Sequence, residues 1–98
     1  MAFLQIMELN TSRFEEMERL SDEWRKATEG KRTLRREIVA RDRNDPTRHL
    51  VLAFFDSYES AMENSNLEET GRISAGMAGV VDSPVVFTDL DILEDRAG

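Results

Sequence analysis

Four short apolar segments with period-two character predict four β-strands in this chain. The first, AFLQIMEL at 2–9, has apolar side chains on both faces, as expected for a central strand that is covered on both sides. The other three segments are 32–41, 49–56 and 85–93. The sequence DRNDPTR separates the middle two, and Asn-Asp-Pro is typical of a turn, so we predict that these two strands form an antiparallel hairpin.

Apolar residues recur every three or four positions from 12 to 28, which predicts an amphipathic helix. These positions are Phe14, Met17, Leu20, Trp24 and Ala27. Ser12 followed by Glu15 fits a capping box at the start of the helix, and Gly30 fits its end.

A second helical region follows the segment 49–56, with Asp56 or Ser57 as its cap. Because asparagine is unfavourable inside a helix, we predict a break near Asn64 and Asn66 that divides this region into two helical pieces. Asn66 is then expected to cap the second piece, which would extend over 67–80.

The predicted order is β-α-β-β-α-β, the pattern of a ferredoxin-like α+β fold with an antiparallel sheet. Right-handed crossovers would place the first and third strands in the middle and the other two at the edges. One edge is basic, with Arg32, Arg35, Arg36, Arg41 and Arg43, and the other is acidic, with Asp89, Asp91, Glu94 and Asp95. In a two-fold dimer each basic edge would meet the partner's acidic edge, and we favour this because both edges are long enough to need a partner; the alternative is charge that only protects exposed edges.

Composition restricts the classes of function. The 98 residues suffice for one domain, 1–98, and the net charge of −7 disfavours nucleic acid as a partner. The absence of cysteine excludes disulfides, thiolate catalysis and cysteine-ligated zinc. The apolar start MAFLQIMEL lacks a basic leader, and no apolar run reaches the length of a membrane span, so we expect a cytoplasmic protein without a membrane partner.

Several segments together resemble the dimeric α+β barrel superfamily, and within it the antibiotic-biosynthesis-monooxygenase-like (ABM) group. They are the order of elements, Trp24 near the end of the first helix, FFDSYESAMENSN after the third strand and SPVVFTDLDIL at the end. The resemblance covers nearly the whole chain and implies a homodimer with two facing sheets and the helices outside. It also implies a cofactor-independent monooxygenase that deprotonates a phenol or quinol, such as an aromatic or polyketide-like molecule, before the ring reacts with dioxygen. The haem-degrading members use a helix-borne histidine, which is missing between Ala61 and Asn64, so no haem or other cofactor is expected.

Four residues are candidates for the site. For catalysis we consider His49, the only histidine and a possible base, and Asn64, whose amide could hold an oxyanion. For substrate binding we consider Trp24 as the wall of an aromatic pocket and Tyr58 as a hydrogen-bond donor. Each has a structural alternative. His49 could be a surface histidine at the end of the hairpin, and Asn64 could mark the break between the two helical pieces. Trp24 could pack in the core, and Tyr58 could be a half-buried anchor.

Other polar residues give weaker indications. Asp89 and Asp91 lie on one face of the last strand, where a solvated or subunit-facing surface explains them more simply than acid–base catalysis. No set of residues has the spacing of a metal site, and the glycines do not form a phosphate loop. The sequence therefore leaves two hypotheses, a small monooxygenase and a non-catalytic dimer that binds a small molecule or serves an accessory role.

Overall fold

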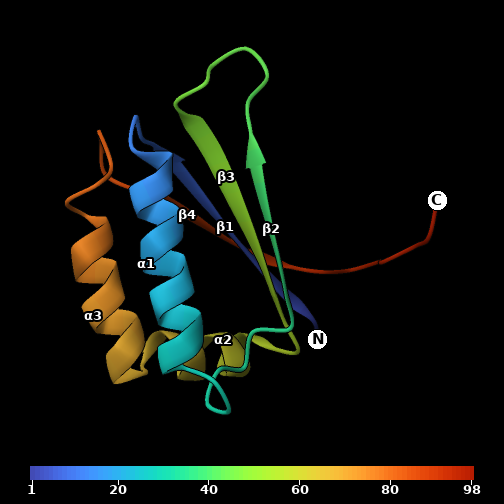
Figure 1. Ribbon diagram of the computed structural model, residues 1–98. Helices are drawn as coiled ribbons and strands as arrows, with labels where there is room; N and C mark the ends of the chain where they lie inside the picture. Colours follow the sequence, from blue (N-terminus) through green and yellow to red (C-terminus); the bar gives the residue numbers. More distant parts are fainter.

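The computed structural model describes all residues 1–98 and has the order β-α-β-β-α-α-β (Figure 1). The elements are β1 (Phe3–Asn10), α1 (Phe14–Ala27), β2 (Arg36–Arg41), β3 (Arg48–Phe55), α2 (Tyr58–Ser65), α3 (Glu68–Met77) and β4 (Val86–Asp91). This order and the four-stranded antiparallel sheet confirm the predicted ferredoxin-like α+β fold. None of the helices has the length and apolar character that a membrane crossing requires.

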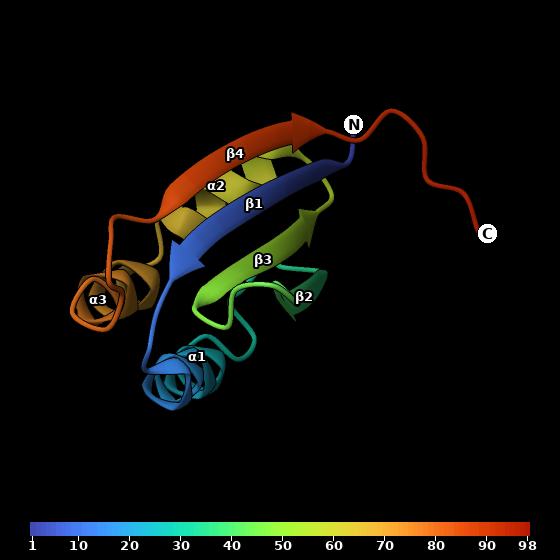
Figure 2. The same cartoon turned by 90° about the horizontal axis from the view of Figure 1, so that it is seen from above.

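The sheet has the strand order β2-β3-β1-β4, which confirms that β1 and β3 are central and that β2 and β4 are edges. The three helices cover one face of the sheet, and no helix covers the other (Figures 1 and 2). We call these the helix-facing side and the open face. Residues that lie opposite each other on neighbouring strands project to the same face, so the register assigns every strand residue to one of them.

Two buried clusters form the core on the helix-facing side. Near one end of the sheet lie Phe3, Ala53, Phe55 and Ala61, and near the other end lie Leu9, Met17, Val51 and Val80. The partly buried Met7 packs against both clusters and joins them. Met17 belongs to the periodic apolar face of α1, which explains why that face turns towards the sheet.

The helix boundaries correct two details of the sequence prediction. The capping box of Ser12 and Glu15 is wrong, because Arg13 is the N-cap of α1 and has no side-chain cap. The hydroxyl of Thr11 instead accepts a hydrogen bond from the Arg13 backbone N–H at 3.0 Å. The break between α2 and α3 is confirmed, but Asn66 is the C-cap of α2 and not the N-cap of α3.

The cap of α2 confirms one of the two predicted candidates. Ser57 is its N-cap, and its hydroxyl accepts a hydrogen bond from the backbone N–H of Ser60 at 3.0 Å. α2 therefore begins at Tyr58, directly after β3 and its short connection, and carries Asn64 near its end.

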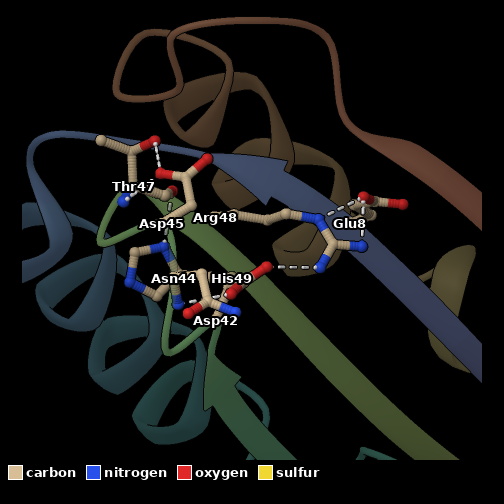
Figure 3. A network of polar contacts seen from close by, with 7 residues as sticks. All are labelled: Glu8, Asp42, Asn44, Asp45, Thr47, Arg48 and His49. Atoms are coloured by element: carbon tan, nitrogen blue, oxygen red, sulfur yellow. Dashed lines mark hydrogen bonds and ion pairs between the residues drawn. The ribbon is translucent and has the colours of Figure 1, made fainter.

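The open face of the sheet is mainly apolar. Its apolar side chains are Leu4, Ile6, Ile38, Ala40, Leu50, Leu52, Phe54, Val86 and Leu90. Ile6 and Leu52 lie opposite each other on the two central strands, so they mark the middle of this face. At one end of the face a charged group consists of Glu8, Arg48 and Asp42, in which Arg48 bonds both carboxylates (Figure 3).

Candidate functional site

Trp24 and Asn64, two of the four predicted site residues, are connected through Thr70. The indole N–H of Trp24 donates to the Thr70 hydroxyl at 2.9 Å, and that hydroxyl donates to the backbone carbonyl of Asn64 at 2.7 Å. The connection ties the last turns of α1 to the junction of α2 and α3. The indole N–H therefore has its partner inside the fold.

The side chain of Asn64 is also engaged within the chain. Asn64 is only 8% exposed, and its Oδ1 accepts a hydrogen bond from the Thr33 backbone N–H at 3.2 Å. The Thr33 hydroxyl in turn donates to the backbone carbonyl of Ser60. These bonds hold the segment before β2 against α2, which explains why β2 begins at Arg36 and not at the predicted residue 32.

We predict that Thr70→Val destabilises the protein by about 1–3 kcal/mol, because valine has the shape of threonine but leaves the indole N–H without a partner and removes one hydrogen bond to the Asn64 carbonyl. Urea unfolding followed by Trp24 fluorescence measures this loss. Thr70→Ser, which keeps the hydroxyl, serves as the matched control and should lose much less. Equal stability of Thr70→Val and the unchanged protein would contradict the structural importance of this connection.

His49 lies at the other end of β3 and is almost fully buried, with 1% of its surface exposed. The prediction of a surface histidine as its structural alternative is therefore wrong. Nε2 accepts a hydrogen bond from Nε–H of Arg41 at 3.1 Å, so Nδ1 carries the ring proton and donates it to the Thr47 carbonyl at 2.9 Å. The ring also stacks on Phe14, with centroids 4.7 Å apart and planes at 12°.

The turn between β2 and β3 positions His49 through its own hydrogen bonds (Figure 3). Asp42 accepts from the backbone N–H of Asn44 at 2.7 Å, and Asp45 accepts from the backbone N–H of Thr47 at 3.0 Å. The hydrogen bond from the Asn44 backbone, with further help from Arg48, lowers the pKa of Asp42. The hydrogen bonds from Thr47 lower the pKa of Asp45, so both carboxylates favour the charged form that holds the turn.

Tyr58 lies apart from the other three candidates. It is 49% exposed, and its ring packs edge-on against the buried ring of Phe3 with centroids 5.5 Å apart. Its hydroxyl makes no hydrogen bond within the chain, so it is available to a ligand. The four predicted residues therefore form no single site: Trp24 and Asn64 lie together, and His49 and Tyr58 lie at opposite ends of β3.

The helix-facing side of β4 carries Phe87 and Asp89, and the sequence prediction considered only Asp89. Phe87 lies opposite Met7 and is 59% exposed, although Met7 packs into the core. Two residues further on, Asp89 lies opposite Gln5 and accepts a hydrogen bond from its side-chain amide at 3.1 Å. The period-two pattern placed Asp89 on one face of a strand, but only the register shows which face that is.

Two hollows of the surface lie elsewhere. A hollow of about 260 Å³ between α1 and α3 is lined by Glu16, Arg19, Leu20, Glu23, Gly76 and Val80. Another, of about 600 Å³, lies along the first turns of α1 and includes Phe14 and Arg41. Neither is lined by Trp24, Tyr58 or Asn64. The structure contains no group of three or more histidine, aspartate or glutamate side chains that could hold a metal ion.

Solved structures share this fold over nearly the whole chain. A provisionally named antibiotic biosynthesis monooxygenase from Nitrosomonas europaea matches with a TM-score of 0.80 and 11% identity, covering 98% of this chain and 94% of that one. One from Caulobacter crescentus CB15, also provisionally named, matches with a TM-score of 0.82 and 14% identity, covering 95% and 91%. Rv0793 from Mycobacterium tuberculosis matches with a TM-score of 0.80 and 13% identity, covering 99% and 100%.

The sequence comparisons add nothing to these structural matches, because no family profile and no curated protein sequence matches the chain. At 10–14% identity the structural likeness establishes the fold. It confirms that the resemblance to the ABM group was correct at the level of the fold.

Proposed function

We propose that this chain forms a homodimer and acts as a cofactor-independent monooxygenase on a hydroxylated aromatic or polyketide-like small molecule. The shared fold supports this proposal, since several of the matching structures bear the name of antibiotic biosynthesis monooxygenase. Two features of the chain itself bear on this proposal. The open face of the sheet concerns the homodimer, and the helix-facing side of β4 concerns the substrate.

The open face supports the homodimer. An apolar sheet face without a helix exposes a contiguous apolar patch, which folded proteins usually cover. A second copy offers the same face, and a two-fold arrangement would bring the two together. The register places both carboxylates of β4, Asp89 and Asp91, on the helix-facing side, so this pairing rests on the apolar side chains and not on the two oppositely charged edges.

The helix-facing side of β4 is the surface that we propose for the substrate. Phe87 and Tyr58 do not lie on the open face, so they stay exposed when the open faces pair. Asp89 lies between them, because it follows Phe87 by two residues and neighbours the position of Phe3, on which Tyr58 packs. A planar hydroxylated ring could contact the exposed aromatic rings and direct its acidic hydrogen to Asp89.

In this proposal Asp89 accepts a proton from the substrate, and the amide of Gln5 orients its carboxylate. For a substrate with a reactive CH₂ group, such as an anthrone, the resulting carbanion forms a C–O bond with dioxygen and, after protonation, a hydroperoxide. Loss of the second C–H proton then cleaves the O–O bond, so that the substrate has given up four electrons in all. One oxygen atom becomes the new carbonyl oxygen and the other leaves as water, so the reaction R₂CH₂ + O₂ → R₂C=O + H₂O balances. The substrate supplies all the electrons.

The four predicted residues enter the proposal with different roles. Tyr58, the first residue of α2, contacts the substrate through its free hydroxyl, whereas Trp24 and Asn64 fix the other end of α2 at its junction with α3. His49 can act as a base only if Arg41 first releases its Nε2. The Gln5 amide occupies only Oδ1 of Asp89 and leaves Oδ2 open, so we expect Asp89 to be the more effective proton acceptor.

Oxygen uptake with 1,8-dihydroxyanthrone tests this function. We expect the protein to consume oxygen faster than the spontaneous oxidation of the anthrone. Loss of a proton acceptor typically costs two to four orders of magnitude in rate, so Asp89→Asn should slow uptake by about 100-fold or more. Asp95→Asn, in the exposed tail, is the matched control and should leave the rate unchanged.

A non-catalytic dimer that binds a small molecule is the second candidate. The internal hydrogen bonds of Trp24 and His49 favour it, because they occupy the indole N–H and both imidazole nitrogens, and in Asn64 the side-chain oxygen is bonded to Thr33. Quenching of Trp24 fluorescence by the anthrone without oxygen uptake would support this candidate against the monooxygenase. If the anthrone neither binds nor reacts, both candidates are overturned for this class of substrate.

A further inference from the structure

We infer that Arg41, held by Phe14 and His49, binds a small singly charged carboxylate. The site lies at the N-terminal end of α1, close to the β2–β3 turn. Tyr58 lies at the far end of β3, so this site is distinct from the surface proposed for the substrate. The inference does not rest on the proposed monooxygenase function.

The guanidinium of Arg41 is oriented before any ligand arrives. Arg41 and His49 are cross-strand partners, and Nε–H of Arg41 donates to Nε2 of His49 at 3.1 Å. The guanidinium carbon lies 5.1 Å from the ring centre of Phe14, which also stacks on His49. Because the other nitrogen of His49 is bonded to the Thr47 carbonyl, the imidazole that anchors the arginine is itself fixed.

The outer edge of this guanidinium has no partner in the chain. Arg25, Arg35 and Arg48 each bond a carboxylate through their terminal nitrogens. Arg41 uses only Nε, which leaves both terminal nitrogens free. A carboxylate cannot approach side-on, since His49 occupies Nε, but it can bind end-on with one oxygen on each terminal nitrogen.

The surroundings favour a singly charged ligand over a doubly charged one. Arg41 lines a hollow of about 600 Å³, together with Phe14, Arg19, Glu15 and Glu18. Within the same hollow Arg13 forms an ion pair with Glu16, so these two charges offset each other. Arg19 offsets only one of the two remaining glutamates, so beside Arg41 one net negative charge is left, which opposes a dianion such as phosphate more than a singly charged ligand. The Phe14 ring and the fixed guanidinium can accommodate an aromatic or aliphatic carboxylate.

Titration of the protein with benzoate, followed by NMR of the arginine Nε–H groups, tests the site. We expect the Arg41 signal to shift with saturation, and acetate and benzoate to bind more tightly than inorganic phosphate. Arg41→Gln should weaken benzoate binding by about tenfold or more, as expected for the loss of charge-assisted hydrogen bonds. Arg43→Gln is the matched control, since Arg43 is an exposed arginine two residues away, and it should change little.

His49 acts here as a positioning residue, and its contribution has a separate readout. In His49→Gln the amide oxygen can still accept from Nε–H of Arg41, so binding should weaken only slightly. His49→Phe keeps the stacking but removes the acceptor, and it should abolish the distinct Nε–H signal and weaken benzoate binding severalfold. Any of three outcomes would overturn the inference: an Arg41 Nε–H shift that does not saturate, equal effects of Arg41→Gln and Arg43→Gln on benzoate binding, or tighter binding of phosphate than of benzoate.

Discussion

Leu52→Lys is expected to dissociate the proposed homodimer into monomers. Leu52 lies on β3 in the middle of the open face, directly opposite Ile6 of β1. Burial of an uncompensated charge costs several kcal/mol, so the dissociation constant of the dimer should rise by at least about 100-fold. Analytical ultracentrifugation over a range of protein concentrations measures this change, and circular dichroism shows whether each protomer stays folded.

Val39→Lys provides the matched control for this experiment. Val39 belongs to edge strand β2 and lies opposite Val51, so it projects to the helix-facing side, where it is 44% exposed. The same chemical change at this position should leave the dimer intact. A monomeric unchanged protein, or a dimer that persists in Leu52→Lys, would contradict pairing through the open face and would leave its apolar side chains unexplained.

His49→Ala should lower the free energy of unfolding by about 3 kcal/mol or more, because it opens a cavity beside Phe14 and removes two hydrogen-bond partners. This is a large part of the stability of a small domain, which is usually about 5–15 kcal/mol. Urea unfolding at one fixed protein concentration measures the loss, since dimerisation would make the midpoint depend on concentration.

His49→Gln separates the two causes of that loss. Glutamine keeps an acceptor for Arg41 and fills more of the space, so its loss should be clearly smaller than that of alanine. A loss below about 1 kcal/mol in His49→Ala would show that the buried ring is dispensable for stability. Such a result would favour the predicted catalytic role of His49 over its structural one.

Ion pairs at the surface contribute little to the stability of the fold. Arg35 donates to Asp56 through two nitrogens and thereby lowers the pKa of that carboxyl, yet both side chains are exposed. Because the pKa of Asp56 is lowered in the folded state, the pair stabilises the fold at pH values above the ordinary pKa of aspartate. This contribution is lost as the pH falls through the pKa of Asp56 in the folded protein. Solvent screens such a pair, so it cannot replace the core or the open face as a source of stability.

The sequence by itself determined the elements and their order. Periods of two and of three to four depend only on local backbone geometry, so they identified the four strands, α1 and the two pieces α2 and α3. The crossover rule then placed β1 and β3 in the centre of the sheet. The cap of α1 was predicted wrongly because Ser12 bonds Asp82, a residue distant in sequence.

The tertiary structure alone decided which side chains meet and which stay free. The same alternating pattern allows Asp89 to face either side of the sheet, and only the pairing of Gln5 with Asp89 settles it. Likewise, Trp24 and Asn64 meet through Thr70, and Arg41 meets His49, because packing brings together groups that the sequence separates. A residue type states which hydrogen bonds a side chain can make, whereas the fold determines which of them are already made and which remain for a ligand.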